Sequence, residues 1–366
     1  MPRAFILSLA LLLSSLAAAS DTLTGANAEP ETRALYTHLK AIAKDHILFG
    51  HQETTAYGIG WQGDPGRSDV KSVTGAYPAV YGWDFFELVE AGTPEKLERF
   101  RSLVSEAYQR GGINTFSWHM YNPVTGENFY DTTPAVAAIL PGGDKHDHYK
   151  TSLDAIAAFA LSLKGRNGGH IPIIFRPFHE HMGNWFWWGK KHCTPEEYVA
   201  LWRFTVDYLR DQKGVHNLLY AYSPNIAYGP SSGGAYLSRY PGDAYVDILG
   251  LDAYVKDMTA ALGPIRQLVE LARERGKVPA LTEAGYPDGL SKTTQTDWYT
   301  TALLAPLAGD PVAREIAYVL VWRNASKDHY WVPYPGGPGE EDFRKFHAHP
   351  IILFEDKLPN MYALSN

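Results

Sequence analysis

Short apolar segments alternate with longer amphipathic ones along almost the whole chain, and this alternation limits the possible folds more than any other feature. The apolar segments are rich in β-branched and aromatic residues, which is typical of buried strands. Eight of them occur, at residues 47–49, 79–83, 113–118, 171–175, 218–222, 246–251, 278–282 and 316–322. Apolar residues three and four positions apart predict helices between them, at residues 94–109, 149–163, 195–212 and 258–275.

Strands that alternate with helices run parallel, and a parallel sheet either stays open or closes into a barrel. Eight strand–helix units in a chain of 366 residues favour closure. An open dinucleotide-binding sheet would also need a GxGxxG turn after its first strand, and none follows residues 47–49. We therefore predict an α/β fold, a single (β/α)8 TIM barrel with extended loops at the C-terminal face of the strands, as one catalytic domain over residues 21–366.

The first twenty residues have the pattern of a secretory signal peptide. Arg3 precedes an apolar run at residues 4–16, and the small residues 17–20 follow it. The run is too short to span a bilayer comfortably. The single cysteine, Cys193, lies far from the cleavage site, which excludes lipidation there and an internal disulfide. We predict that residues 1–20 are removed and that the protein is secreted or periplasmic, with no membrane span.

Composition points to an uncharged partner. A formal net charge of -7 argues against nucleic acid, whose binding depends on clustered Lys and Arg. Ten Trp and 23 Tyr raise the aromatic share to 13%, and flat aromatic faces with polar edges suit sugar rings, although many of these rings can simply be packing. We expect a polysaccharide or oligosaccharide as the partner, and a monomeric protein.

Polar and aromatic residues follow each predicted strand. In a barrel of this type the C-terminal strand ends build the active site. Helix capping would explain Asp, Ser and Asn at these positions, but not Arg, Glu, His and Trp. The strand ends read His51-Gln52-Glu53, Trp83-Asp84, Trp118-His119, Arg176-Pro177-Phe178-His179-Glu180, Ser223-Pro224-Asn225, Asp252-Ala253-Tyr254, Glu283 and Trp322-Arg323-Asn324.

Two glutamates from different strands form a candidate catalytic pair. Hydrolysis of a glycosidic bond with retention needs one protonated and one ionised carboxyl group, about 5 Å apart. Glu180 follows the fourth strand, where burial near the Trp-rich stretch would raise its pKa. Glu283 ends the seventh strand, where Arg176 and Tyr254 can hold it ionised. A strand-end glutamate can also be no more than a structural ion-pair partner.

Metal chemistry is not expected. The histidines beside Glu180 are two residues apart, whereas zinc proteases place theirs four apart as HExxH. Residues two apart on a helix point in different directions, and no cysteine or second histidine cluster completes a site. We predict no catalytic metal and no cofactor. The only N-glycosylation sequon, at Asn324, is interpreted as a chance match, and Cys193 as a structural thiol.

Long segments of the chain resemble glycoside hydrolase family 26, whose best-known members are β-mannanases. The segment IPIIFRPFHEHMGNWFWWG carries the most specific likeness. LTEAGY, VLVWRNAS, LFGHQETT, YGWDFF and SWHMYNPVTG extend it over most of the chain. The resemblance implies a retaining hydrolase that cleaves β-1,4-mannosidic bonds in mannan, galactomannan or manno-oligosaccharides by double displacement.

The resemblance also implies roles for individual residues. Glu180 would be the acid/base and Glu283 the nucleophile. His179 would face the −1 sugar and bind its 2-hydroxyl or the nucleophile, and His119 would line the same subsite. Without the motif, either histidine could equally be an ordinary core residue.

Five further residues match positions of the family. Tyr254 resembles the tyrosine that hydrogen-bonds the nucleophile, with Asp252 beside it ordering the site and lining the substrate-binding region. Trp322 resembles the stacking platform under the −1 sugar, and Arg323 a −2 subsite contact. Trp185 is expected near the +1 subsite. The two tryptophans that follow it can equally be loop packing.

One departure concerns the leaving-group side. Typical members read HEMNGSWFWWG, whereas this chain has HEHMGN before Trp185, so contacts in the +1 subsite carry over least. Alternatives within the family are hydrolysis of β-1,3-xylan or mixed-linkage glucan, and exo-acting release of mannobiose. A non-catalytic carbohydrate-binding protein is the alternative outside enzymes.

Overall fold

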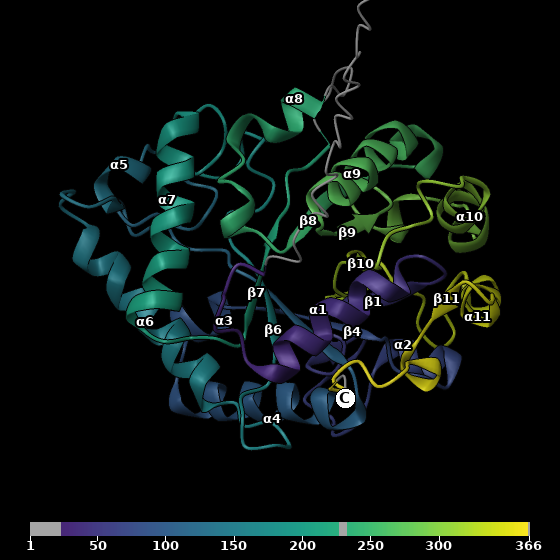
Figure 1. Cartoon of the computed structure of the whole chain (residues 1–366). Helices are drawn as coiled ribbons and strands as arrows, with labels where there is room; N and C mark the ends of the chain where they lie inside the picture. The colour runs from purple at the N-terminus through teal and green to yellow at the C-terminus, as the bar shows by residue number, and fades with distance from the viewer. Residues whose placement is uncertain (1–22, 227–232, 365–366) are drawn as a thin grey trace, which may run out of the picture.

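Eight parallel strands close into a barrel in the computed structural model, which describes residues 23–226 and 233–364. The strands pair in chain order, and β10 pairs with β1 to close the ring, with Leu48 opposite Tyr318. Helices surround the strands (Figure 1). This confirms the predicted (β/α)8 barrel. The strands are β1 (Ile47–Gln52), β4 (Val80–Asp84), β5 (Ile113–Ser117), β6 (Ile173–Arg176), β7 (Leu218–Tyr222), β8 (Ile248–Tyr254), β9 (Val278–Gly285) and β10 (Tyr318–Val321).

The barrel strands are buried on both faces, inside against one another and outside against the helices. Every residue of β1, β4, β5, β6, β7, β9 and β10 is buried. Burial on both faces is why these strands appear in the sequence as continuous apolar runs rather than as alternating patterns.

The main helices begin where capping residues allow. Thr93 accepts a hydrogen bond from the backbone of Lys96 at the start of α4, and Gly111 ends that helix with a left-handed φ of 100°. Thr194 and Glu197 form a capping box on α7. The longer helices are α1 (Pro30–Ile42), α4 (Pro94–Arg110), α6 (His146–Ser162), α7 (Pro195–Asp207), α9 (Leu262–Arg275) and α11 (Glu340–Ala348). The short ones are α2 (Asp69–Thr74), α3 (Phe86–Val89), α5 (Val136–Ile139), α8 (Gly233–Tyr236) and α10 (Ala305–Gly309).

Two predicted helices change character along their length. Residues Tyr208–Gln212 continue α7 as a π-helix, and Met258–Ala261 precede α9 as a 3-10 helix. Apolar spacing does not separate these close variants. Another π-helix, Trp298–Leu304, leads into α10 between β9 and β10.

Three short strands were not predicted. β11 (Ile352–Leu353) runs parallel to β1 at its first two residues. β2 (Tyr57–Gly58) and β3 (Trp61–Gln62) form an antiparallel hairpin in the loop after β1. Segments of two residues carry no periodic signal.

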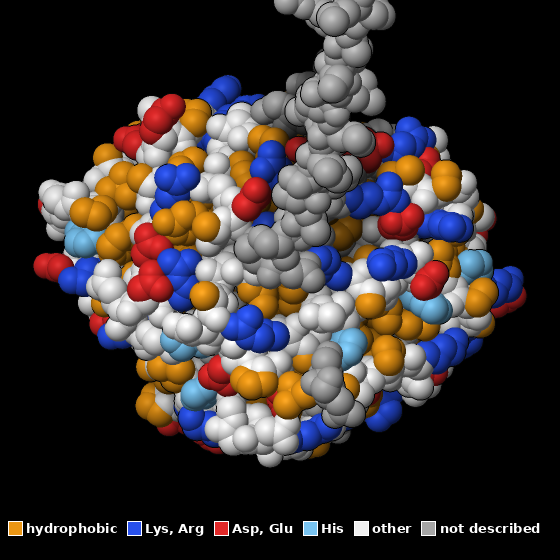
Figure 2. Space-filling model, viewed as in Figure 1, with side chains coloured by type: hydrophobic (Ala, Val, Ile, Leu, Met, Phe, Trp, Pro, Cys, Tyr) orange, Lys and Arg blue, Asp and Glu red, His pale blue; other side chains and the backbone are white. Residues whose placement is uncertain are grey.

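Within residues 23–226 and 233–364, no helix is long and apolar enough to cross a membrane. The predicted signal peptide, residues 1–20, lies outside the described residues. On the face shown in Figure 2, Lys and Arg side chains are scattered among acidic and apolar ones.

Candidate active site

A cleft of about 820 Å³ lies at the C-terminal ends of the barrel strands. Seven residues predicted from the sequence line it: His119, His179, Glu180, Asp252, Tyr254, Glu283 and Trp322. Trp185, also predicted, lines it from the loop after β6. The cleft therefore gathers side chains that lie more than 200 residues apart in sequence, as parallel strand ends in a barrel must.

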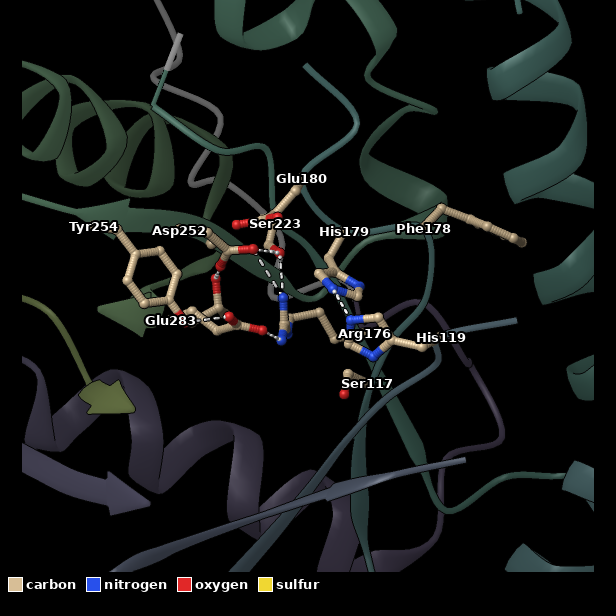
Figure 3. A network of polar contacts seen from close by, with 12 residues as sticks. Ser117, His119, Arg176, Phe178, His179, Glu180, Ser223, Asp252, Tyr254 and Glu283 are labelled. Atoms are coloured by element: carbon tan, nitrogen blue, oxygen red, sulfur yellow. Dashed lines mark hydrogen bonds and ion pairs between the residues drawn. The ribbon is translucent and has the colours of Figure 1, made fainter. Parts of the chain in front are cut away.

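Two neighbouring side chains bind the Glu283 carboxylate. Arg176, the last residue of β6, forms an ion pair with its Oε1. The Tyr254 hydroxyl donates a 2.6 Å hydrogen bond to its Oε2. Figure 3 shows both contacts converging on Glu283 from opposite sides. A cation on one oxygen and a phenol on the other favour the ionised carboxylate, which is the form a nucleophile needs.

Asp252 fixes Arg176 from the other side of its guanidinium. Arg176 Nη1 donates to Asp252 Oδ2 at 2.9 Å, and Ser223 Oγ donates to the same oxygen at 3.1 Å. Thr282 Oγ1 donates to Oδ1 at 2.7 Å. Burial raises the pKa of Asp252, and the Arg176 charge opposes that rise. Both oxygens of Asp252 are thus bound by protein groups, which suits a residue that positions Arg176 and orders the site, and Asp252 also lines the cleft.

Glu180 lies in a strained turn directly after β6. It has a left-handed φ of 53°, and its backbone N–H donates to the Ser223 carbonyl at 2.8 Å. Phe178, two residues earlier, also has a positive φ, of 48°. Such backbone conformations in residues with a Cβ persist only where the surroundings enforce them, and they cluster at functional sites.

The Glu180 carboxyl group is adapted to hold a proton. Burial raises its pKa well above the usual value, and the negative charge of Glu283 raises it further. Trp185 acts in the other direction, since its Nε1 donates to Glu180 Oε2 at 2.7 Å. The His181 ring makes no hydrogen bond to Glu180. It packs in the core against Tyr198 and Tyr222, with ring centroids 4.5 and 4.8 Å apart.

The two site histidines contact each other rather than the nucleophile. His179 Nε2 lies 3.2 Å from His119 Nε2, and Nδ1 of His119 contacts Asp84 Oδ2. The structure therefore places His179 on the cleft wall and directs its Nε2 at His119 instead of at Glu283. The Trp322 ring lies edge-on to His119, with centroids 5.8 Å apart.

The remaining predicted residues divide into cleft and packing positions. Trp185 is 39% exposed on the cleft wall. Trp187 and Trp188 are fully buried, and their indoles donate to the carbonyls of Met120 and His179. They are therefore loop packing, and Trp188 anchors the backbone next to Glu180. Arg323 is not among the residues that line the cleft, and it donates to the Tyr57 hydroxyl at 3.0 Å.

Several site residues escaped the sequence analysis. Thr282 supports Asp252, and its small hydroxyl gives no signal of its own; Ser223, which does the same, was identified only as a strand-end residue. Further polar cleft residues lie outside the barrel strands, where neither periodicity nor strand position marks them, among them Tyr130, Asp288, Lys292, Asp328 and His329. Asp84 was seen only as one strand-end residue among several.

The described ranges hold no group of three or more His, Cys, Asp or Glu side chains arranged to bind a metal ion. Asn324 is buried, and its Nδ2 donates at 2.9 Å to Asp69 and to the Val332 carbonyl. This amide is inaccessible to a glycan, in agreement with the interpretation of its sequon as a chance match. Cys193 is a buried free thiol beside Arg239.

The fold and the paired carboxylates define a class. A (β/α)8 barrel whose strand ends bring a partly buried glutamate of raised pKa and a cation-bound glutamate into one aromatic cleft has the architecture of a glycoside hydrolase. Residues 24–303 match the family model of Glycosyl hydrolase family 26, and the chain belongs to that family.

Individual relatives agree with this assignment. A mannan endo-1,4-β-mannosidase from Bifidobacterium adolescentis is 40% identical over 352 residues, which cover 89% of this chain and 35% of that protein. The chain thus spans about a third of that relative's length. A GH26 β-mannanase from Bacteroides ovatus superposes with a TM-score of 0.84 at 43% identity, covering 92% and 98% of the two chains. A modular endo-β-1,4-mannanase from Cellulomonas fimi gives 0.88 at 41% identity, covering 93% of this chain and 79% of that one.

Proposed function

We propose that this chain is a retaining glycoside hydrolase that cleaves β-1,4-mannosidic bonds in mannan, galactomannan or manno-oligosaccharides, and that it is an endo-acting β-mannanase. The observation that carries the proposal is that two carboxyl groups in one cleft have different surroundings. Glu283 is bound by Arg176 and Tyr254, whereas Glu180 is partly buried and its pKa is raised. The names of the relatives supply the sugar and the linkage. No cofactor is needed for this chemistry.

In the first step Glu283 attacks the anomeric carbon of the −1 sugar. The bond to the leaving oxygen breaks, and Glu180 gives that oxygen its proton. Arg176 and Tyr254 keep the attacking carboxylate ionised and in place. The products are a glycosyl ester on Glu283, a free chain end and an ionised Glu180.

In the second step water replaces the ester. Once Glu283 is esterified it carries no charge, so the charge repulsion that raised the pKa of Glu180 disappears. Glu180 is then a stable carboxylate that can accept a proton from water as the water attacks the anomeric carbon. The sugar leaves with its original configuration, and Glu180 recovers its proton.

The surrounding residues have supporting roles in this proposal. Trp322 stacks under the −1 sugar, and His119 and His179 bind its hydroxyls. Trp185 contacts the leaving group at +1, beside Glu180. Arg323 contributes to the −2 subsite together with its partner Tyr57.

The direct test is product formation from mannan. The purified protein should release reducing ends, and Glu283→Ala should release none while still binding the polysaccharide. A wild-type protein that binds mannan but releases nothing from any β-1,4 or β-1,3 glycan would instead be a carbohydrate-binding protein. Comparing hydrolysis rates on mannan, β-1,3-xylan and lichenan distinguishes a β-mannanase from a hydrolase of β-1,3-xylan or mixed-linkage glucan.

The product series tests the mode of action. An endo-acting enzyme gives oligosaccharides of mixed length early in the digestion of galactomannan and mannohexaose. Mannobiose as the sole early product would mean release from a chain end and would overturn the endo assignment.

We also propose that residues 1–20 are a cleaved signal peptide, that residues 21–366 form one catalytic domain, and that the enzyme acts as a secreted or periplasmic monomer. The N-terminal pattern supports export. N-terminal sequencing of the protein recovered outside the cytoplasm should begin at Asp21, and light scattering should give the mass of one chain.

A further inference from the structure

A chain of three ionisable side chains runs from the wall of the barrel into the cleft. Asp84, the last residue of β4, binds His119 with both oxygens: Oδ2 contacts Nδ1, and Oδ1 accepts the backbone N–H of His119 at 3.1 Å. His119 Nε2 then lies 3.2 Å from His179 Nε2 (Figure 3). The outer histidine is adjacent in sequence to Glu180. Nothing in the proposed mechanism so far uses Asp84.

The hydrogen bonds among Asp84, His119 and His179 determine which ring nitrogens carry a proton. A carboxylate only accepts hydrogen bonds, so Nδ1 of His119 carries a proton. Burial raises the pKa of Asp84, but the hydrogen bonds from His119 and from the backbone of Phe86 act against that effect, and the net shift is downward. In a neutral His119 the second nitrogen, Nε2, is then an acceptor. The two facing Nε2 atoms share a single proton, which must belong to His179.

The surroundings of His179 Nδ1 independently place the single proton of His179 on Nε2. His179 Nδ1 is buried, and no atom of the described residues is within hydrogen-bonding distance of it. A buried N–H without a partner is costly, and a bare lone pair there is the better alternative. Burial and the nearby Arg176 charge both lower the pKa of His179, which disfavours a second proton on the ring. The single proton of His179 therefore sits on Nε2.

We propose that Asp84 is a positioning residue that sets the tautomers of both site histidines, His119 protonated on Nδ1 and His179 on Nε2. The pair then presents one acceptor, His119 Nε2, and one donor, His179 Nε2–H, side by side on the cleft wall. Without substrate this donor and this acceptor bond to each other, and a single sugar hydroxyl inserted between them replaces that bond by donating to His119 Nε2 and accepting from His179 Nε2–H. The pair thus recognises a hydroxyl in one fixed orientation.

Asp84→Asn tests the proposal because the asparagine amide should reverse the tautomers of both His119 and His179. Asp84 Oδ1 accepts two backbone N–H groups, from Phe86 at 2.9 Å and from His119. The oxygen of an asparagine would keep these bonds, and its NH₂ would face His119 Nδ1. That nitrogen would then have to accept, His119 Nε2 would carry the proton, and His179 would be left with a buried, unpaired Nδ1–H.

The experiment is nitrogen-15 NMR of the histidine rings in the full-length mature protein at neutral pH, with signals assigned from His119→Asn and His179→Asn. Protonated and unprotonated ring nitrogens resonate far apart, so the tautomer is read directly. The wild type should show His119 as the Nδ1–H form and His179 as the Nε2–H form, and Asp84→Asn should show both reversed. A wild-type His119 protonated on Nε2, or on both nitrogens, overturns the proposal, as does an Asp84→Asn spectrum with unchanged tautomers.

A loss of kcat/KM is expected only if the proposed function is correct, whereas the histidine tautomers do not depend on that function. The kinetic prediction and the tautomer prediction can therefore fail separately. Asp84→Asn should lower kcat/KM on mannohexaose by about tenfold or more, as expected when a buried donor loses its partner. Asp247→Asn is the matched control. Asp247 is also a buried aspartate, but it binds backbone N–H groups of Thr24 and Tyr220, before β8 at the other end of the barrel. Its loss should leave tautomers and kcat/KM close to wild type. Reversed tautomers with unchanged kcat/KM would refute the recognition of the hydroxyl.

Discussion

The indole N–H of Trp185 donates a 2.7 Å hydrogen bond to Oε2 of Glu180. This contact stabilises the ionised carboxylate, whereas burial and the charge of Glu283 stabilise the protonated acid. Trp185 is 39% exposed, so the bond lies at the open side of the cleft, where a leaving sugar would sit. The acid strength of Glu180 is therefore set by a balance that one indole proton can shift.

Removing that proton should shift the alkaline limit of activity. In Trp185→Phe the aromatic face remains but the hydrogen bond is lost, so the pKa of Glu180 rises further. The alkaline limb of the kcat/KM profile should move up by about half a pH unit, as expected for a partly exposed hydrogen bond. A limb that stays in place, or that moves to lower pH, would show that the indole does not stabilise the carboxylate.

Tyr254→Phe should slow the chemistry while the fold is kept. The hydroxyl donates to Glu283 Oε2, and a hydrogen bond to a charged group contributes about 1.5 to 3 kcal/mol. If it acts mainly in the transition state, kcat falls about 10- to 100-fold with little change in KM. Steady-state kinetics on mannohexaose and a melting curve separate this from unfolding. A variant with wild-type kcat would remove Tyr254 from the mechanism.

Arg176→Met should unfold more easily as well as lose activity. The guanidinium is buried between Asp252 and Glu283, and removing one partner of a buried ion pair costs about 3 to 5 kcal/mol. Denaturant titration measures this loss. Arg266→Met is the matched control, because its pair with Asp310 is half-exposed and should cost less than about 1 kcal/mol. Equal losses in the two variants would contradict the account.

His51 predicts an acid-dependent loss of stability. Burial lowers its pKa to about 3, with the Asn324 side chain opposing the shift, so in the folded protein the ring stays neutral between pH 6.5 and 3. In the unfolded chain it gains a proton below about pH 6.5, so stability falls as the pH drops. Near pH 4.5 the difference is about 2 to 3 kcal/mol.

The measurement is the free energy of unfolding at pH 7 and pH 4.5 for the wild type and for His51→Gln. The variant lacks this titration, so its loss between the two pH values should be smaller by about the predicted amount. A constant offset between the two proteins at both pH values would show that His51 does not drive the loss.

The barrel could be predicted because its strands are buried on both faces. Runs such as those at residues 218–222 and 278–281 are apolar throughout, so they stand out between helices with three- and four-residue spacing. β2, β3 and β11 could not be found, because a two-residue strand is defined by its partner and not by its own side chains. The π-helix at Tyr208–Gln212 has the same apolar spacing as an α-helix.

The centre of the site could also be predicted, since strand order places Glu180 and Glu283 at the same end of the barrel. The orientation of individual groups could not. The sequence did not predict that His179 Nε2 lies against His119, or that Asp252 forms an ion pair with Arg176. These choices depend on side-chain rotamers that adjacent strands impose on one another. Tyr130 and His329 reach the cleft on loops whose paths the sequence does not reveal.

The proposed mechanism makes Glu283 the nucleophile and Glu180 the acid. A 2-deoxy-2-fluoro-β-mannosyl fluoride distinguishes the two glutamates, because the fluorine slows both steps and the good leaving group lets the first proceed, so the glycosyl ester accumulates. After proteolysis, mass spectrometry should find the fluorosugar on the peptide that contains Glu283, bound to that residue. A label on Glu180, or hydrolysis of mannan by a protein that never forms an adduct, would contradict the account.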